Sequence, residues 1–74
     1  MPSVIKNQCT VLQHSAFLFF LTTLADQTHG VSLEYTTEGV SGKTRIYYTL
    51  TCDTVDIARE VTDKITEALP IYGG

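Results

Sequence analysis

The first apolar pattern in the chain has a period of two and covers residues 4–12. Apolar side chains fall on one side of this segment and polar ones on the other, with Asn7 as a polar exception on the apolar side. The two sets are Ile5, Cys9 and Val11, and Lys6, Gln8 and Thr10. A period of two predicts a half-buried strand.

The stretch AFLFFLTTLAD, residues 16–26, is the most apolar part of the chain. Eight of its first ten residues are apolar, a run too short to span a membrane, which takes about 20 residues. A secretion signal is disfavoured, because only Lys6 supplies basic charge upstream and the preceding segment predicts a strand. The apolar side chains instead fill one arc of a helix, with Ser15 as the expected N-cap and Gly30 just past the C-terminal end. The arc comprises Ala16, Phe17, Leu18, Phe20, Leu21, Leu24 and Ala25.

Phe19 does not fit this helical pattern. It falls on the polar side of the helix, close in angle to Thr22 and Asp26. Two explanations are open: a neighbouring loop covers the ring, or the ring contacts another chain. On the second explanation, Phe19, Thr22 and Asp26 form an interface between chains.

Residues 31–38 and 43–52 predict a β-hairpin closed by the loop GVSG. If Glu38 pairs with Lys43, apolar residues of the two strands oppose one another on a single face. The predicted apolar pairs are Tyr35–Ile46, Leu33–Tyr48 and Val31–Leu50. A shift of one residue would destroy this agreement, so we expect this register.

Residues 54–69 predict a second helix. Asp53 is the expected N-cap, and Asp56 three positions later resembles a capping box. Pro70 is expected to end the helix. The apolar stripe comprises Ile57, Ala58, Val61, Ile65, Ala68 and Leu69, and the charged face comprises Asp56, Arg59, Glu60, Asp63 and Glu67.

The predicted element order is β-α-β-β-α within one small α+β domain, residues 1–74. Each helix has one apolar side, so we expect a two-layer sandwich with both helices on one face of a three-stranded sheet. The pattern leaves open whether the first strand pairs with the second or the third. The other sheet face is then uncovered and is expected to carry Lys6, Gln8, Thr10, Ser32, Glu34, Thr36, Lys43, Arg45, Tyr47, Thr49 and Thr51.

Length and charge restrict the class of protein. A chain of 74 residues is near the lower limit for a self-sufficient core, and such chains often add a second subunit. The net charge of −3 and the absence of a basic run disfavour nucleic-acid binding. The two cysteines, Cys9 and Cys52, form no CxxC motif, which favours free thiols and a cytoplasmic protein.

The residue types that carry out catalysis do not form a recognisable pattern. His14 and His29 flank the first helix, whose length of about 22 Å prevents them from sharing a metal ion. Both cysteines are predicted to face the core, where thiols are usually inert. The GVSGKT segment precedes a strand, whereas a phosphate-binding loop opens a helix. We therefore expect a protein that is not an enzyme and has no metal or cofactor.

The final Gly73 and Gly74 are similar, over these two residues alone, to the tails of ubiquitin-like and sulfur-carrier proteins. The similarity implies activation at the C-terminus. In those proteins the tail follows a strand of a β-grasp fold, whereas here it follows a helix and Pro70. Carrier function is therefore a minor alternative.

The uncovered sheet face is the surface on which we expect binding. Tyr and Arg are frequent at interface hot spots, which singles out Tyr47 and Arg45, with Glu34 diagonal to Arg45 and with Lys43 nearby. One exposed aromatic is too few for stacking of single-stranded RNA. We therefore expect a binding or regulatory module, an adaptor or inhibitor of a larger protein, that works as a homo-oligomer. The alternative is a binder of a small polar ligand in a pocket between subunits.

Overall fold

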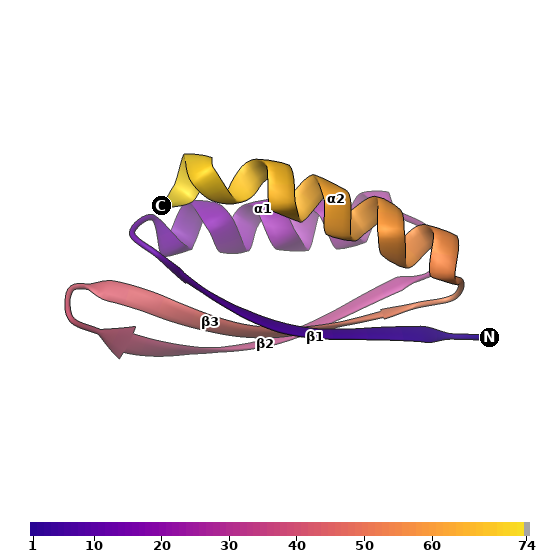
Figure 1. The fold of residues 1–74 in the computed structure, drawn as a ribbon, viewed down its shortest axis with the longest axis horizontal. Coiled ribbons are helices and arrows are strands. Elements are labelled where there is room, and N and C mark those ends of the chain that lie inside the picture. Colours follow the sequence, from indigo (N-terminus) through magenta and orange to yellow (C-terminus); the bar gives the residue numbers. More distant parts are fainter. Residues whose placement is uncertain (74) are drawn as a thin grey trace.

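A computed structural model of the protein describes residues 1–73. The elements are β1 (Ser3–Val11), α1 (His14–Gln27), β2 (Val31–Val40), β3 (Lys43–Cys52) and α2 (Val55–Tyr72). The three strands form an antiparallel sheet of order β1-β3-β2, and both helices lie on the same side of it (Figure 1). The predicted α+β fold and its element order are confirmed. The first strand, whose neighbour the sequence left open, pairs with β3.

The core lies between the central strand and the two helices. Alternate residues of β3 point toward the helices and are buried, as the period of two requires. They meet side chains spaced three and four apart on each helix, which is the spacing of one helical face. The buried set comprises Val11, Phe17, Leu21, Leu24, Ile46, Tyr48, Leu50, Cys52, Ala58, Val61, Ile65 and Ala68. Ala16, expected on the buried arc of α1, is instead exposed.

The predicted register of the hairpin is wrong by two residues. Leu33 pairs with Leu50 and Tyr35 with Tyr48, whereas the apolar pattern paired Leu33 with Tyr48. The shift is even, so every side chain still points to the predicted face. The apolar pattern has a period of two and therefore cannot distinguish two registers that differ by two residues.

The turn sets the register. Val40 pairs with Lys43, so the connection is a two-residue loop of Ser41 and Gly42 rather than the four residues GVSG. Ser41 has φ 49° and Gly42 has φ 81°. Two consecutive positive φ values are those of a type I′ turn, whose twist matches that of the flanking strands. The backbone conformation of the turn therefore selects one of two registers that fit the apolar pattern equally well.

The predicted helix caps are displaced by one or two residues. Helix α1 begins at His14, with Gln13 rather than Ser15 at the N-cap position. Thr54 rather than Asp53 caps α2, and its hydroxyl accepts a hydrogen bond of 3.2 Å from the Ile57 amide. The Asp53 amide instead donates to the Gly30 carbonyl at 2.9 Å. Asp53 therefore joins the connection between α1 and β2 to the end of β3.

Pro70 does not end α2, which continues to Tyr72. Proline removes a helical hydrogen bond, so the last turn needs other support. The Tyr72 carbonyl accepts hydrogen bonds from the amides of Leu12 and Gln13, at 3.2 and 3.1 Å. The Tyr72 ring packs on Phe17, with ring centroids 5.5 Å apart and the planes at 63°, and on Phe20 at 5.8 Å. Tertiary contacts therefore extend the helix past the residue that was predicted to stop it.

Replacement of Tyr72 by alanine should lower the free energy of unfolding by about 2–3 kcal/mol, because two aromatic contacts and buried area are lost. Urea unfolding followed by circular dichroism measures this change. Ile71→Ala is the matched control, since Ile71 is the next residue and is 70% exposed. Equal effects of the two substitutions would contradict the role assigned to Tyr72.

Gly42→Ala should cost about 1–2 kcal/mol of stability, because Gly42 adopts a left-handed conformation that disfavours a Cβ atom. Gly39→Ala is the control in the same hairpin. A Cβ atom at Gly39 would meet nothing within 4 Å, and its φ lies outside the left-handed region. That variant should be neutral, or more stable by up to about 1 kcal/mol. The same unfolding measurement compares the two, and a Gly42 variant as stable as the Gly39 variant would refute the turn assignment.

Candidate functional site

The sheet has one surface that points away from the helices, which we call the outer face. No element among residues 1–73 covers it (Figure 1). The outward residues of β3 alternate with its buried ones, and β1 and β2 place further polar side chains on either side. The polar set comprises Lys6, Gln8, Thr10, Ser32, Glu34, Thr36, Glu38, Lys43, Arg45, Tyr47, Thr49 and Thr51, and Val4, opposite Thr51, lies on the same face.

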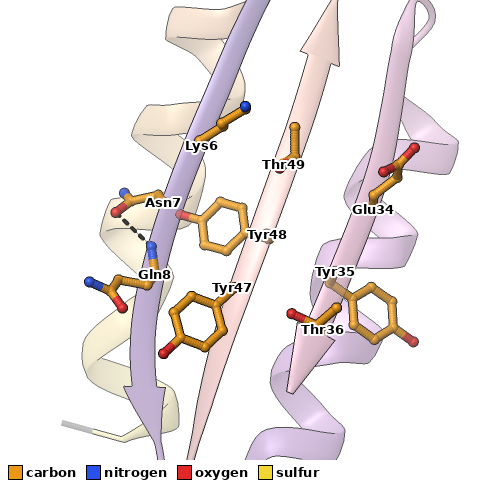
Figure 2. A pocket seen from close by; sticks show the side chains of 9 residues that line it. All are labelled: Lys6, Asn7, Gln8, Glu34, Tyr35, Thr36, Tyr47, Tyr48 and Thr49. Atoms are coloured by element: carbon orange, nitrogen blue, oxygen red, sulfur yellow. Dashed lines mark hydrogen bonds between the residues drawn. The ribbon is translucent and has the colours of Figure 1, made fainter. Parts of the chain in front are cut away.

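The outer face contains a shallow hollow of about 560 Å³ that crosses all three strands. Figure 2 shows Lys6 and Gln8 on β1, Glu34 and Thr36 on β2, and Tyr47 and Thr49 on β3 between them. The hollow is wide and open to solvent. Its lining mixes charges of both signs with amides, hydroxyls and the rings of Tyr35, Tyr47 and Tyr48. Such a surface suits a broad polar partner better than it suits an apolar small molecule.

The strand register arranges the outer face in rows that run across the sheet. Lys6 and Glu34 both pair with Thr49, so these three residues form one row. The next row is Gln8, Tyr47 and Thr36, and the one after it is Thr10, Arg45 and Glu38. Charged residues of opposite sign therefore occupy the two edges of the first row, with a neutral residue between them.

Tyr47, Glu38 and Arg45 form a cluster on the outer face, in which one hydrogen bond joins Tyr47 to Glu38. The Tyr47 hydroxyl donates to Glu38 Oε2 at 3.1 Å, and Arg45 lies directly opposite Glu38 across the strand pair. The adjacent Tyr47 hydroxyl raises the pKa of Arg45, and the negative charge of Glu38 raises it further. Arginine is charged at any physiological pH. The exposed Tyr47 ring is held by its hydroxyl.

The four residues predicted to form the binding surface do not all lie together. Arg45 and Tyr47 are neighbours, as expected, but Glu34 lies opposite Thr49 and is not diagonal to Arg45. Lys43 lies at the turn and pairs with Val40, so the predicted Glu38–Lys43 pair is wrong.

Glu38 is the residue of the candidate site that the apolar pattern did not predict. The predicted register assigned it to Lys43, two positions away from its true partner, Arg45. The signal that could have found it is the Ser41-Gly42 pair. Both residue types are frequent in two-residue hairpin turns, and a turn there puts Glu38 opposite Arg45.

Phe19 is 73% exposed, and no loop among residues 1–73 covers it. The hypothesis of a covering loop is therefore wrong, and contact with another chain stays a prediction. The Thr22 hydroxyl donates back to the carbonyls of Leu18 and Phe19, both at 3.0 Å, while Asp26 is exposed. Thr22 is thus partly engaged by its own helix, which leaves Phe19 and Asp26 as the available side chains of this face.

Nucleophilic and metal-binding groups are dispersed over residues 1–73. No group of three or more potential metal ligands comes together there. Cys9 and Cys52 are free cysteines, and burial raises the pKa of both thiols, with the charge of Asp53 adding to the effect at Cys52. Protonated thiols are weak nucleophiles. In the same part of the chain, no helix is both long and apolar enough to cross a membrane.

Gly73 lies close to the connection between β1 and α1. A Cβ atom at Gly73 would come within 2.7 Å of the Leu12 amide nitrogen and the Val11 Cα. Gly74, the other residue of the carrier alternative, lies outside the described residues. Gly73 therefore fills a place that only glycine fits, which is a structural reason for its presence.

Comparisons with protein-family models, curated proteins and solved structures find no match to this chain.

The stability of the protein should fall as the pH rises above about 9. Burial raises the pKa of Cys9, Cys52 and Tyr48 in the folded state, from ordinary values of 9.0 for the thiols and 10.0 for the phenol. Above those ordinary values the unfolded chain binds fewer protons than the folded one, so the free energy of unfolding decreases with pH. Urea unfolding in a reducing buffer at pH 8 and pH 10.5 measures this decrease. The double variant Cys9→Ala/Cys52→Ala should lose less stability between the two pH values, and an equal loss would show that the thiols are not responsible.

Proposed function

We propose that this chain is a small non-enzymatic binding module that recognises a protein through its outer face and works as a homo-oligomer. In this role it acts as an adaptor or inhibitor of a larger protein. The observation that carries the proposal is the cluster of Tyr47, Glu38 and Arg45 on a sheet face that residues 1–73 leave uncovered.

The chemistry of this cluster supports protein recognition. Tyrosine and arginine dominate interface hot spots, because they offer a large contact area together with directional hydrogen bonds. The bond from Tyr47 to Glu38 fixes a ring that is 38% exposed, so less side-chain entropy is lost when a partner binds. The permanent charge of Arg45 provides a site for a carboxylate of the partner.

The dispersed reactive groups support a non-enzymatic role. His14 begins α1 and His29 follows its end, so the helix separates them. The raised pKa values of Cys9 and Cys52 favour protonated thiols at neutral pH. Two free thiols also support a reducing compartment such as the cytoplasm. The close approach of Gly73 to Val11 and Leu12 disfavours the carrier alternative, which needs an extended, accessible tail.

A small polar ligand is the second candidate for the outer face. The hollow of about 560 Å³ falls within the range of ligand pockets, roughly 300–1,000 Å³. Lys6 and Glu34 line it with opposite charges. The hollow is open to solvent, so a second subunit would be needed to enclose a ligand. A ligand would raise the melting temperature in proportion to the logarithm of its concentration, whereas a pure protein-binding module would show no such rise.

Affinity capture with matched variants tests the protein-binding proposal. The double variant Arg45→Ala/Tyr47→Ala should lose a protein that the wild type retains, with affinity weakened at least about tenfold. The variant Phe19→Ala/Asp26→Ala, on the solvent side of α1, should retain that protein. Circular dichroism and thermal melting check that both variants fold. A protein retained by the outer-face variant and lost by the α1 variant would overturn the assignment of the outer face.

A further inference from the structure

We infer that the outer face accepts a second copy of this chain, in a face-to-face dimer whose twofold axis runs along β3. The inference rests on the proposed function in one respect, since both assign binding to the outer face. It adds the identity of a partner, the symmetry and the residues that pair.

The charges on the outer face are segregated by strand. Lys6 is the single charged residue of β1, while the charged residues of β2 are Glu34 and Glu38. The central strand β3 carries Lys43 and Arg45. The β1 edge of the outer face is therefore basic and the β2 edge is acidic. The two edges lie two inter-strand spacings apart.

A twofold axis parallel to β3, midway between two facing sheets, places β1 of one copy over β2 of the other. Each row of one copy then faces the same row of the other copy. Lys6 and Glu34 share the row of Thr49. Lys6 of each copy then faces Glu34 of the other copy, so the dimer contains this pair twice. Packed sheets lie about 10 Å apart, a distance that a lysine and a glutamate side chain span together.

The other rows fit the same arrangement. Gln8 meets Thr36 of the second copy, which allows an amide-to-hydroxyl hydrogen bond, and the two Tyr47 rings meet near the axis. The axis also brings together like charges of β3, the two Arg45 side chains and, at the turn, the two Lys43 side chains. Each Arg45 lies directly opposite Glu38 of its own sheet. Facing sheets cross at about 30°, so the rows near the middle of β3 make the closest contacts.

The charges also discriminate against the other face-to-face symmetry. A twofold axis perpendicular to the strands places β2 over β2 and reverses the order of the rows. About the row of Tyr47, Glu34 would then meet Glu38 of the second copy, and this repulsive contact would occur twice. Like-charge contacts are a common means of excluding a wrong partner or orientation. The axis along β3 is therefore favoured.

The dimer should be weak and sensitive to salt. Three strands about 4.8 Å apart and nine or ten residues long, at about 3.4 Å per residue, give a footprint of roughly 500 Å² per copy. A standard interface buries about 800 Å² per partner, so association should depend on concentration. The Lys6–Glu34 pairs lie at the sheet edges, where salt screens them.

Charge-reversal variants at the two paired positions test the inference by sedimentation equilibrium at low ionic strength. Lys6→Glu alone places acid against acid at both pairs, and Glu34→Lys alone places base against base. Each single variant should dimerise roughly tenfold or more weakly than the wild type. An equimolar mixture of the two single variants should recover dimers, since every facing pair is then opposite in sign. The double variant Lys6→Glu/Glu34→Lys should also recover them.

Matched controls change the same charges away from the outer face. Arg59→Glu and Glu67→Lys alter exposed residues of α2 and should dimerise like the wild type. Single variants that dimerise like the wild type, or a mixture that stays monomeric, would overturn the inference. A wild-type protein that is monomeric at millimolar concentration would overturn it as well.

The outcomes for the inference and for the proposed function are separable. One outcome is that the mixture of the two charge-reversal variants forms dimers while a captured target still binds the Arg45→Ala/Tyr47→Ala variant. This outcome supports the dimer and rejects recognition of the target by the outer face. A monomeric wild type whose target is lost in the Arg45→Ala/Tyr47→Ala variant rejects the dimer and the homo-oligomeric state, and keeps the recognition of a target by the outer face.

Discussion

The alternation of side chains along β3 is the constraint on which the rest of the structure depends. Ile46, Tyr48 and Leu50 point into the layer of helices, and both other strands pair with this one. Because successive side chains of a strand point to opposite faces, the requirement to bury these residues also directs Arg45 and Tyr47 outward. The candidate site is thus the reverse side of the core. A change in the core pattern of β3 would rearrange the outer face with it.

The elements and the face of each strand residue could be predicted from the sequence, because both depend on periodicity alone. The register could not, since the apolar pattern agrees equally well with two alignments that differ by two residues. The choice between them lies in the backbone conformation of Ser41 and Gly42. The row that joins Lys6 to Glu34 required, in addition, the pairing of β1 with β3.

The extension of α2 past Pro70 shows a different limit of local rules. Proline is a reliable sign that a helix ends when only neighbouring residues are considered. Here the Tyr72 ring fits against Phe17 and Phe20, which lie about 50 positions earlier in the sequence. Phe19 shows the converse case, because its position outside the apolar arc is visible in the sequence and is confirmed by its exposure. Local patterns identify residues that lack a place in the core, but long-range contacts decide where an element stops.

The hydrogen bonds from Leu12 and Gln13 to the Tyr72 carbonyl have a consequence for the dynamics of the chain. These two amides lie in a short connection, where hydrogen exchange with solvent is ordinarily fast. Their protection here depends on the last turn of α2, which is more than 50 residues away in the sequence. The connection and the helix end are therefore expected to open together, so that fraying of the C-terminal turn would expose the Leu12 and Gln13 amides to solvent.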